Sequence, residues 1–272
     1  MRRVTFAFFV AAALAPHTAT ADDAIAVDAR IDVPLTAAAG AAWIASEALK
    51  PDLVGDRCRW CDRDGRGRDT LGSLDRGARD TLRWSDPASA DLASNFTGFA
   101  AAPLISLGGL ALAASLAGRG PEAWHDTLVA LEATMLAADL NQAVKFVAMR
   151  QRPYAHAVAG GLRGPDDNLS FYSGHTSLVF SLATSAGTIA SMRHRELAPL
   201  VWASGLTAAV VTGWLRIAAD KHYLSDVVTG AAVGALIGFA VPYVFHGRRE
   251  SAGGVAWSLI GVPGGLGVGG AY

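Results

Sequence analysis

The chain has 272 residues, of which 51% are hydrophobic and 17% are charged, and its formal net charge is -1. This length is ample for one sizeable hydrophobic core, and the balanced charge argues against a nucleic-acid-binding protein. Because the charged fraction is below the usual quarter and the mean hydropathy is +0.29, the composition lies between that of a buried helical protein and that of a membrane protein.

The first 21 residues have the layout of a secretory signal peptide. Two arginines precede an apolar run at residues 4–14, and the small-residue pattern Ala19-Thr20-Ala21 follows. We expect cleavage before Asp22 and export of the rest of the chain. The alternative is an uncut anchor helix, although the apolar run is short for a membrane span.

Cys58 and Cys61 are the only cysteines of the chain. In an exported protein, a local disulfide is the expected state of such a pair. Zinc binding would need four ligands and a redox motif would need a thioredoxin-like context, so both are weaker alternatives.

Six apolar segments alternate with short polar ones, and their lengths suit helices better than strands. Alanine, the best helix former, dominates them. The segments cover residues 31–49, 96–116, 124–149, 177–192, 200–219 and 227–245. We therefore predict an all-α bundle of about six helices.

The remaining segments set the expected domain boundaries. Residues 50–94 form a charged insertion, and the tail "GVPGGLGVGGAY" is too rich in glycine for a helix, which leaves an extended strand or a loose segment. The predicted parts are a signal peptide (1–21), an N-terminal helix with the charged segment (22–95), a helical-bundle domain (96–246) and a C-terminal tail (247–272).

Two segments, residues 96–116 and 227–245, have about 20 residues without a charge, enough to span a membrane. The helix at residues 124–149 carries seven charged, amide or imidazole side chains, which must turn inward if that helix is embedded. We favour a membrane-embedded bundle over a soluble exported one.

The arginines suggest an orientation for such a bundle. They fall in connections that would be cytoplasmic if the ends of the polar helices face outward. A cytoplasmic position of these arginines agrees with the positive-inside rule. These residues are Arg119, Arg193, Arg195, Arg248 and Arg249. The topology works if residues 31–49, which include Glu47, pack on the outside of the bundle instead of spanning.

Three polar blocks lie at the ends of hydrophobic helices. Their chemically active residues are Lys145 and Arg152 in "KFVAMRQRP", Ser173, Gly174 and His175 in "YSGHTS", and Arg216, His222 and Asp226 in "RIAADKHYLSD". Three cations, two histidines, one carboxylate and a Ser-Gly turn suit a phosphate group. We therefore predict a phosphate site.

The cations and the turn would bind the phosphate oxygens. Lys145 acts as a point charge, whereas Arg152 and Arg216 are planar forks. Lys145 and Arg152 are two helical turns apart and share a face if their helix continues that far. Ser173 can offer its hydroxyl, and Gly174 lets the backbone approach an anion closely.

The two histidines would have opposite proton roles. His175, at the start of its helix, is positioned as a general acid toward the leaving oxygen. His222 and Asp226 share a face if their helix has begun, since they are four residues apart. The carboxylate would then hold one imidazole nitrogen protonated, and the other would act as a nucleophile toward phosphorus.

These blocks resemble the signature of the type 2 phosphatidic acid phosphatase superfamily, which includes bacterial class A acid phosphatases and vanadium haloperoxidases. The family pattern is Lys, six residues, Arg-Pro; then Pro-Ser-Gly-His; then Ser-Arg, five residues, His, three residues, Asp. The chain departs from it at Tyr172 and Leu215, where the family has proline and serine. These departures bear on substrate fit and rate more than on reaction class.

The resemblance implies hydrolysis of a phosphate monoester or diphosphate without a metal or cofactor. His222 would attack phosphorus, His175 would protonate the leaving group, and water would release phosphate from the phosphohistidine. An outward-facing site in a membrane implies a lipid substrate: an isoprenyl diphosphate, phosphatidic acid, phosphatidylglycerophosphate or a lipid A phosphate. A soluble periplasmic protein would act on a small phosphate ester. No nucleic-acid partner is expected.

Two other functions remain open. A vanadate-dependent haloperoxidase would use the same ligands, but such relatives look longer and need further halide-site residues. A non-enzymatic anion transporter or lipid-binding protein would also bury charges. Taken singly, Lys145 and Arg152 are ordinary snorkelling cations, and His222 with Asp226 is an ordinary surface pair. Their joint order and spacing favour the enzyme.

Overall fold

The computed structural model describes residues 24–55, 57–158, 164–247, 256–262 and 265–271, the last two ranges as backbone only. The predicted signal peptide at residues 1–21 therefore lies outside the described residues, as does part of the predicted tail. Residues Ile25–Gly247 form one compact unit, and the two segments after residue 255 belong to a second one.

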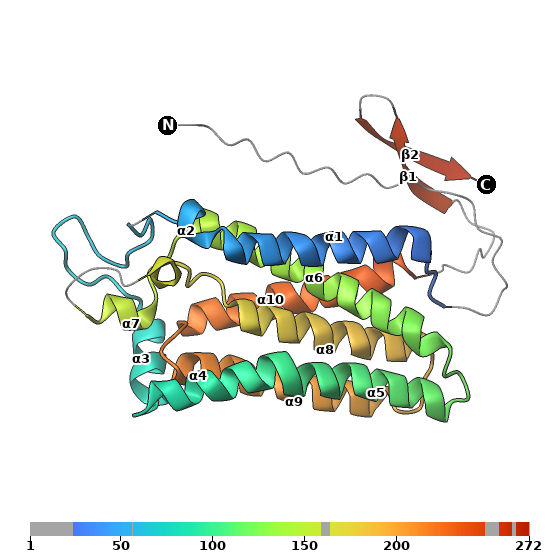
Figure 1. Ribbon diagram of the computed structural model, residues 1–272, viewed down its shortest axis with the longest axis horizontal. Coiled ribbons are helices and arrows are strands. Elements are labelled where there is room, and N and C mark those ends of the chain that lie inside the picture. Colours follow the sequence, from blue (N-terminus) through green and yellow to red (C-terminus); the bar gives the residue numbers. More distant parts are fainter. Residues whose placement is uncertain (1–23, 56, 159–163, 248–255, 263–264, 272) are drawn as a thin grey trace. The chain divides into compact units, whose positions relative to one another are not determined.

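Among the described residues of the compact unit, all the regular elements are helices, and Figure 1 shows the long ones side by side. The α-helices are α1 (Ala29–Ala48), α2 (Lys50–Leu53), α3 (Ser73–Leu82), α4 (Pro87–Phe96), α5 (Ala102–Leu116), α6 (Glu122–Ala148), α7 (Pro153–His156), α8 (Gly174–Met192), α9 (Ala198–Ala218) and α10 (Leu224–Ala240). Short turns of other helix types are η1 (Thr97–Ala101), η2 (Pro165–Asn168) and η3 (Val241–Phe245). The six predicted helices are present, so the predicted all-α bundle is confirmed.

Helix α8 is the centre of the bundle and packs against α5, α6, α9 and α10. Its partner α10 brings glycines at four-residue intervals to the contact: Gly230, Gly234 and Gly238. A Cβ atom on Gly234 would lie 2.2 Å from the carbonyl oxygen of Ser177. Because only hydrogen fits there, the two backbones pack closely, as small residues permit between membrane helices. This packing fixes the starts of α8 and α10 beside each other.

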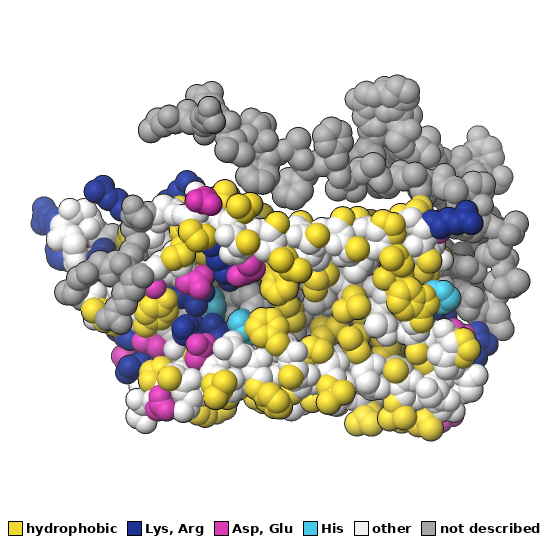
Figure 2. Space-filling view, viewed as in Figure 1, with side chains coloured by type: hydrophobic (Ala, Val, Ile, Leu, Met, Phe, Trp, Pro, Cys, Tyr) yellow, Lys and Arg dark blue, Asp and Glu magenta, His cyan; other side chains and the backbone are white. Residues whose placement is uncertain are grey.

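Within the described residues, three helical stretches are long and apolar enough to cross a membrane: Pro87–Leu116, Ala198–Ala218 and Leu224–Phe245. The first joins α4, η1 and α5, so it starts nine residues before the predicted segment at 96–116. Figure 2 shows hydrophobic side chains over much of the side of the bundle. The predicted membrane character is supported by these stretches.

The charged insertion at residues 50–94 contains three helices that the apolar pattern did not predict: the short α2, α3 and most of α4. It is tied to the bundle by Arg79 of α3, whose Nε and Nη2 donate to Asp220 at 2.6 and 2.7 Å. The structure also joins Cys58 and Cys61 in a disulfide. The insertion is thus a folded part of the compact unit.

The tail contains two strands, β1 (Ala256–Val262) and β2 (Gly265–Ala271), which pair antiparallel. Ala256 pairs with Ala271 at one end of the register and Val262 pairs with Gly265 at the other. Of the two predicted alternatives for this segment, the extended strand is therefore the one observed.

Candidate active site

The predicted site residues meet at one end of the bundle, where α6 ends, α8 begins and α9 passes to α10. They surround a cavity of about 300 Å³. Six of them line it: Lys145, Arg152, Gly174, His175, Arg216 and His222. Figure 2 shows Lys, Arg, Asp and Glu side chains gathered at this end, in contrast to the apolar side of the bundle.

Lys145 and Arg152 line the same cavity but do not share a helix. Helix α6 ends at Ala148, because Met149 adopts the left-handed conformation with φ 43°. Arg152 is instead the residue before α7, and its backbone N–H donates to the carbonyl of Asp167 at 2.7 Å. The condition for a shared helical face is therefore not met, although both cations reach the cavity.

Arg152 is 7% exposed, and its Nε atom is buried with no hydrogen-bond partner in the part of the chain that the structure describes. Arg216, 3% exposed, likewise has an Nε atom without a described partner. Its Nη1 donates to Asp91 Oδ1 and to the Ser94 hydroxyl, both at 2.7 Å. Buried donors without partners are costly, and an anion in the cavity would supply the acceptors.

Gly174 is the first residue of α8 and is closely surrounded. A Cβ atom there would lie 2.7 Å from Asn141 Oδ1 and 3.1 Å from Lys145 Nζ. The glycine thus brings the backbone beside the lysine ammonium group, as predicted for anion binding. The start of a 19-residue helix also places unpaired backbone N–H groups and a partial positive charge at the cavity.

Ser173 does not line the cavity. It is fully buried, and its hydroxyl shares a 2.8 Å hydrogen bond with the Thr176 hydroxyl. Its backbone N–H donates to the Asp226 carbonyl at 3.1 Å, which links the start of α8 to that of α10. The expected hydroxyl contact to phosphate is therefore replaced in this structure by a packing role.

His175 lies in the first turn of α8 and faces the cavity beside α4 and η1. Its Nε2 is 2.9 Å from Asn95 Oδ1, and its ring makes a T-shaped contact with Phe99 at 4.6 Å between ring centres. The amide oxygen accepts a hydrogen bond if Nε2 carries the proton. Asn95 and Phe99 were not predicted as site residues, because their position depends on the packing of α4 against α9.

His222 precedes α10 and is not helical, so it does not share a helix face with Asp226 as expected. Its Nδ1 lies 2.8 Å from the carbonyl oxygen of Ser170, but 3.8 Å from Asp226 Oδ2. The carbonyl can only accept, so Nδ1 carries the proton and Nε2 keeps its lone pair. Burial, followed by the positive charge of Arg152, holds the pKa of His222 well below its usual value of 6.5. The imidazole is therefore neutral at pH 7.

Asp226 acts on His222 through Ser170. The carboxylate is fully buried and accepts a hydrogen bond from the Ser170 hydroxyl and another, at 3.0 Å, from the Tyr223 N–H. It therefore fixes the residue whose carbonyl holds His222. At 3.8 Å the carboxylate and the imidazole are too far apart for the predicted direct hydrogen bond, and an indirect connection through Ser170 takes its place.

Arg150 is a central residue of the site that the sequence did not reveal. Only 2% exposed, it pairs with three carboxylates: Asp226 at 2.7 Å, Asp75 at 2.9 Å and Asp62 at 3.0 Å. Its guanidinium also lies 4.2 Å from the ring centres of both Trp60 and Tyr223. These contacts join the charged insertion to the start of α10.

The cavity and the helices around it define a class of protein. An all-α bundle whose helix ends surround a lysine, two arginines and two histidines has the arrangement expected of the type 2 phosphatidic acid phosphatases. Residues 126–250 match the family described as the PAP2 superfamily. The resemblance seen in the sequence is thereby confirmed.

Two known proteins are similar to parts of this chain. A lipid A 1-phosphatase of Porphyromonas gingivalis is 39% identical over 69 residues, which are 25% of this chain and 15% of that protein. A solved structure is also similar: the transmembrane PAP2 type phosphatidylglycerolphosphate phosphatase of Bacillus subtilis. Its sequence identity is 20% and its TM-score 0.38, over 78% of this chain and 90% of that one.

Proposed function

We propose that this protein hydrolyses a phosphate monoester or diphosphate of a lipid through a phosphohistidine intermediate, without a metal ion in the reaction. The observation that carries this proposal is His222. It is a buried, neutral imidazole, its Nδ1 is engaged by the Ser170 carbonyl, and it lines a cavity together with Lys145, Arg152 and Arg216. Such an imidazole offers Nε2 as a nucleophile.

The first chemical step breaks the bond between phosphorus and the leaving oxygen. Nε2 of His222 attacks phosphorus, and the leaving oxygen takes a proton from the imidazolium form of His175, which becomes neutral. In the second step water attacks the phosphorus of the phosphohistidine, and His175 takes the proton of that water. Inorganic phosphate leaves, and both histidines return to their starting states.

The cations stabilise the charge of the transferring phosphoryl group. Lys145, Arg152 and Arg216 line the cavity from three different elements, so they surround an anion instead of meeting it on one side. The free Nε donors of the two arginines and the backbone at Gly174 add further hydrogen bonds. This charge supports phosphoryl transfer without Lewis-acid assistance.

A lipid substrate is supported by the surroundings of the cavity. Its walls include Trp43, Phe99 and Leu178 beside the charged residues, and α4 and α9, which contribute to it, belong to the membrane-capable stretches. A volume of about 300 Å³ suits a phosphate headgroup but not acyl chains, which would lie along the apolar sides of the bundle. The name of the Porphyromonas relative agrees with this class of substrate.

The test is phosphate release by the protein in detergent, with EDTA present, from a lipid diphosphate and from a soluble aryl phosphate. We expect release from both, faster from the lipid, and a loss of at least about 10³-fold in His222→Ala. His125→Ala is the matched control, since His125 is an exposed histidine of α6 away from the cavity. Release that persists in His222→Ala, or that requires a metal, would overturn the proposal.

A further inference from the structure

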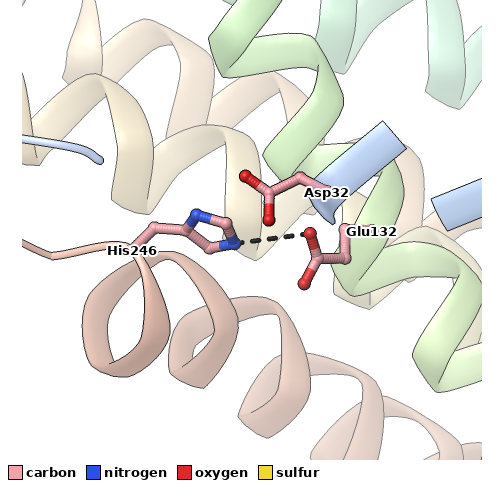
Figure 3. Close-up of side chains that lie close together, drawn as sticks. All are labelled: Asp32, Glu132 and His246. Atoms are coloured by element: carbon pink, nitrogen blue, oxygen red, sulfur yellow. Dashed lines mark ion pairs between the residues drawn. The ribbon is translucent and has the colours of Figure 1, made fainter. Parts of the chain in front are cut away.

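A second group of ionisable side chains is buried away from the active-site cavity. Asp32 of α1, Glu132 of α6 and His246, which follows η3, point toward one another (Figure 3). They are 8%, 5% and 5% exposed. Glu132 precedes Lys145 by 13 residues of the same helix, a rise of about 20 Å, so the group does not belong to the phosphate site.

The spacing of the three side chains fits a metal ion. One ligand atom from each residue can be chosen so that all three lie within 4.8 Å of one another. His246 Nε2 is 3.4 Å from Glu132 Oε2. A tetrahedral ion with bonds of about 2.1 Å holds its ligand atoms about 3.4 Å apart, so this pair already has the separation of two ligands.

The hydrogen bonds around the group leave ligand atoms free. Glu132 Oε2 is buried and, among the described residues, has no hydrogen-bond partner. His246 Nδ1 is 2.8 Å from the Ala26 carbonyl, which places a proton there, so Nε2 faces Glu132 and is the atom that would bind an ion once the ion displaces its proton. Asp32 Oδ2 accepts from the Asp28 N–H at 2.7 Å. Metal-binding histidines and carboxylates are typically oriented by such outer contacts.

The charge of the group also favours a divalent cation. Two buried carboxylates are costly without compensation, and a protonated His246 would neutralise only one of them. A divalent ion neutralises both and leaves the imidazole uncharged. One imidazole with two carboxylates suits Zn²⁺ well, and Mn²⁺ less well because of the nitrogen ligand.

We propose that Asp32, Glu132 and His246 bind one divalent transition-metal ion, with Zn²⁺ the best fit. The ion would join the start of α1 to the middle of α6 and to the end of η3. A backbone hydrogen bond already joins the segment before α1 to the residue after η3, since the Ala26 N–H donates to the His246 carbonyl at 2.8 Å. The site is structural and takes no part in the proposed phosphoryl transfer.

The experiment uses the untagged full-length protein in detergent, stripped with EDTA and returned to metal-free buffer. Titration with Zn²⁺ alone, followed by calorimetry and elemental analysis, is expected to give one tightly bound ion per chain. Thermal unfolding is expected to shift upward on addition of Zn²⁺, because the ion binds the folded chain and not the dispersed ligands of the unfolded one.

Two variants test the assignment of the ligands. Glu132→Gln and His246→Gln keep the side-chain size and are each expected to weaken Zn²⁺ binding by at least about 100-fold, since a lost ligand costs no less than a lost outer contact. Asp139→Asn is the control, because it changes a carboxylate of the same helix outside the group. It should bind Zn²⁺ as the unchanged protein does.

Circular dichroism and phosphate release at low temperature show whether each variant is folded. If one of the two glutamine variants does not fold, Asp32→Asn is tested in its place. A folded, unchanged protein that binds less than about a tenth of an equivalent of Zn²⁺ or Mn²⁺ would overturn the proposal and leave an ion triad only. Tight binding retained in both glutamine variants would overturn it as well. Loss of activity with the metal still bound would instead concern the phosphate site.

Discussion

At the scale of single residues, the proposed reaction depends on the protonation of His222. Its Nδ1 proton is held by a backbone carbonyl, which unlike a carboxylate does not titrate. Burial and the nearby Arg152 disfavour the charged imidazole. The nucleophile is therefore available without a catalytic base, and Asp226 contributes by fixing Ser170.

This environment predicts the pH dependence of the enzyme. Only the neutral imidazole attacks, so activity is lost as pH falls through the pKa of His222 in the folded protein, which is depressed. We expect the acid limb of kcat/KM for a soluble aryl phosphate to lie below pH 6.5, after correction for the ionisation of the substrate near pH 6. A fall of kcat/KM at or above pH 6.5 that remains after the correction for substrate ionisation would contradict the assignment of His222 as the nucleophile.

At the scale of elements, the charged insertion and the bundle meet at Arg150. A guanidinium that pairs with Asp62, Asp75 and Asp226 connects the loop after the disulfide, α3 and α10. A lysine keeps the charge but lacks the planar, extended guanidinium that reaches three carboxylates from separate nitrogens and stacks between two rings. The insertion is therefore expected to affect catalysis although none of these three carboxylates lines the cavity.

Arg150→Lys is expected to lower kcat by about 10- to 100-fold with little change in KM, because Asp226 and then Ser170 shift by a fraction of an ångström. The melting temperature should fall as well. Arg193→Lys is the control, since Arg193 pairs with Asp126 at the far end of the bundle. It should lower stability without an effect on kcat. An equal loss of kcat in both variants would indicate a general structural effect instead of positioning.

The contrast between Lys145 and Arg150 shows how far the sequence alone could lead. Lys145 was found because it stands at a fixed spacing from other charged residues of recognisable chemistry. Such a spacing can be read from the sequence without a structure. Arg150 has its role only through Asp62 and Asp75, which are brought to it by tertiary packing. Whether the helix of Lys145 continues to Arg152 was left open for a related reason, since no glycine marks the left-handed turn at Met149.

At the scale of the whole molecule, the direction of α1 constrains the orientation in a membrane. Gln142 Nε2 donates to the Ser46 hydroxyl at 3.1 Å, and Glu132 lies beside Asp32, so α1 runs parallel to α6. Both helices begin at the end where Arg193 pairs with Glu122 and end at the cavity. If the cavity faces outward, α1 begins on the cytoplasmic side.

An outward-facing cavity in an embedded bundle is therefore incompatible with cleavage before Asp22. The seven residues 22–28 span at most about 25 Å, less than the hydrocarbon core of about 30 Å. For the embedded protein we expect the leader to be retained, which N-terminal sequencing of membrane-extracted material would reveal. An N-terminus at Asp22 in that material would rule out the outward orientation.

The central claim is the covalent intermediate on His222, and rapid-quench labelling tests it most directly. The protein is mixed with substrate carrying a labelled phosphoryl group, quenched in alkali, in which phosphohistidine survives, and mapped by mass spectrometry. The account predicts label on His222, formed before steady state and absent in His222→Ala. Label on another residue, or single-turnover hydrolysis by the active protein without any labelled peptide, would contradict it.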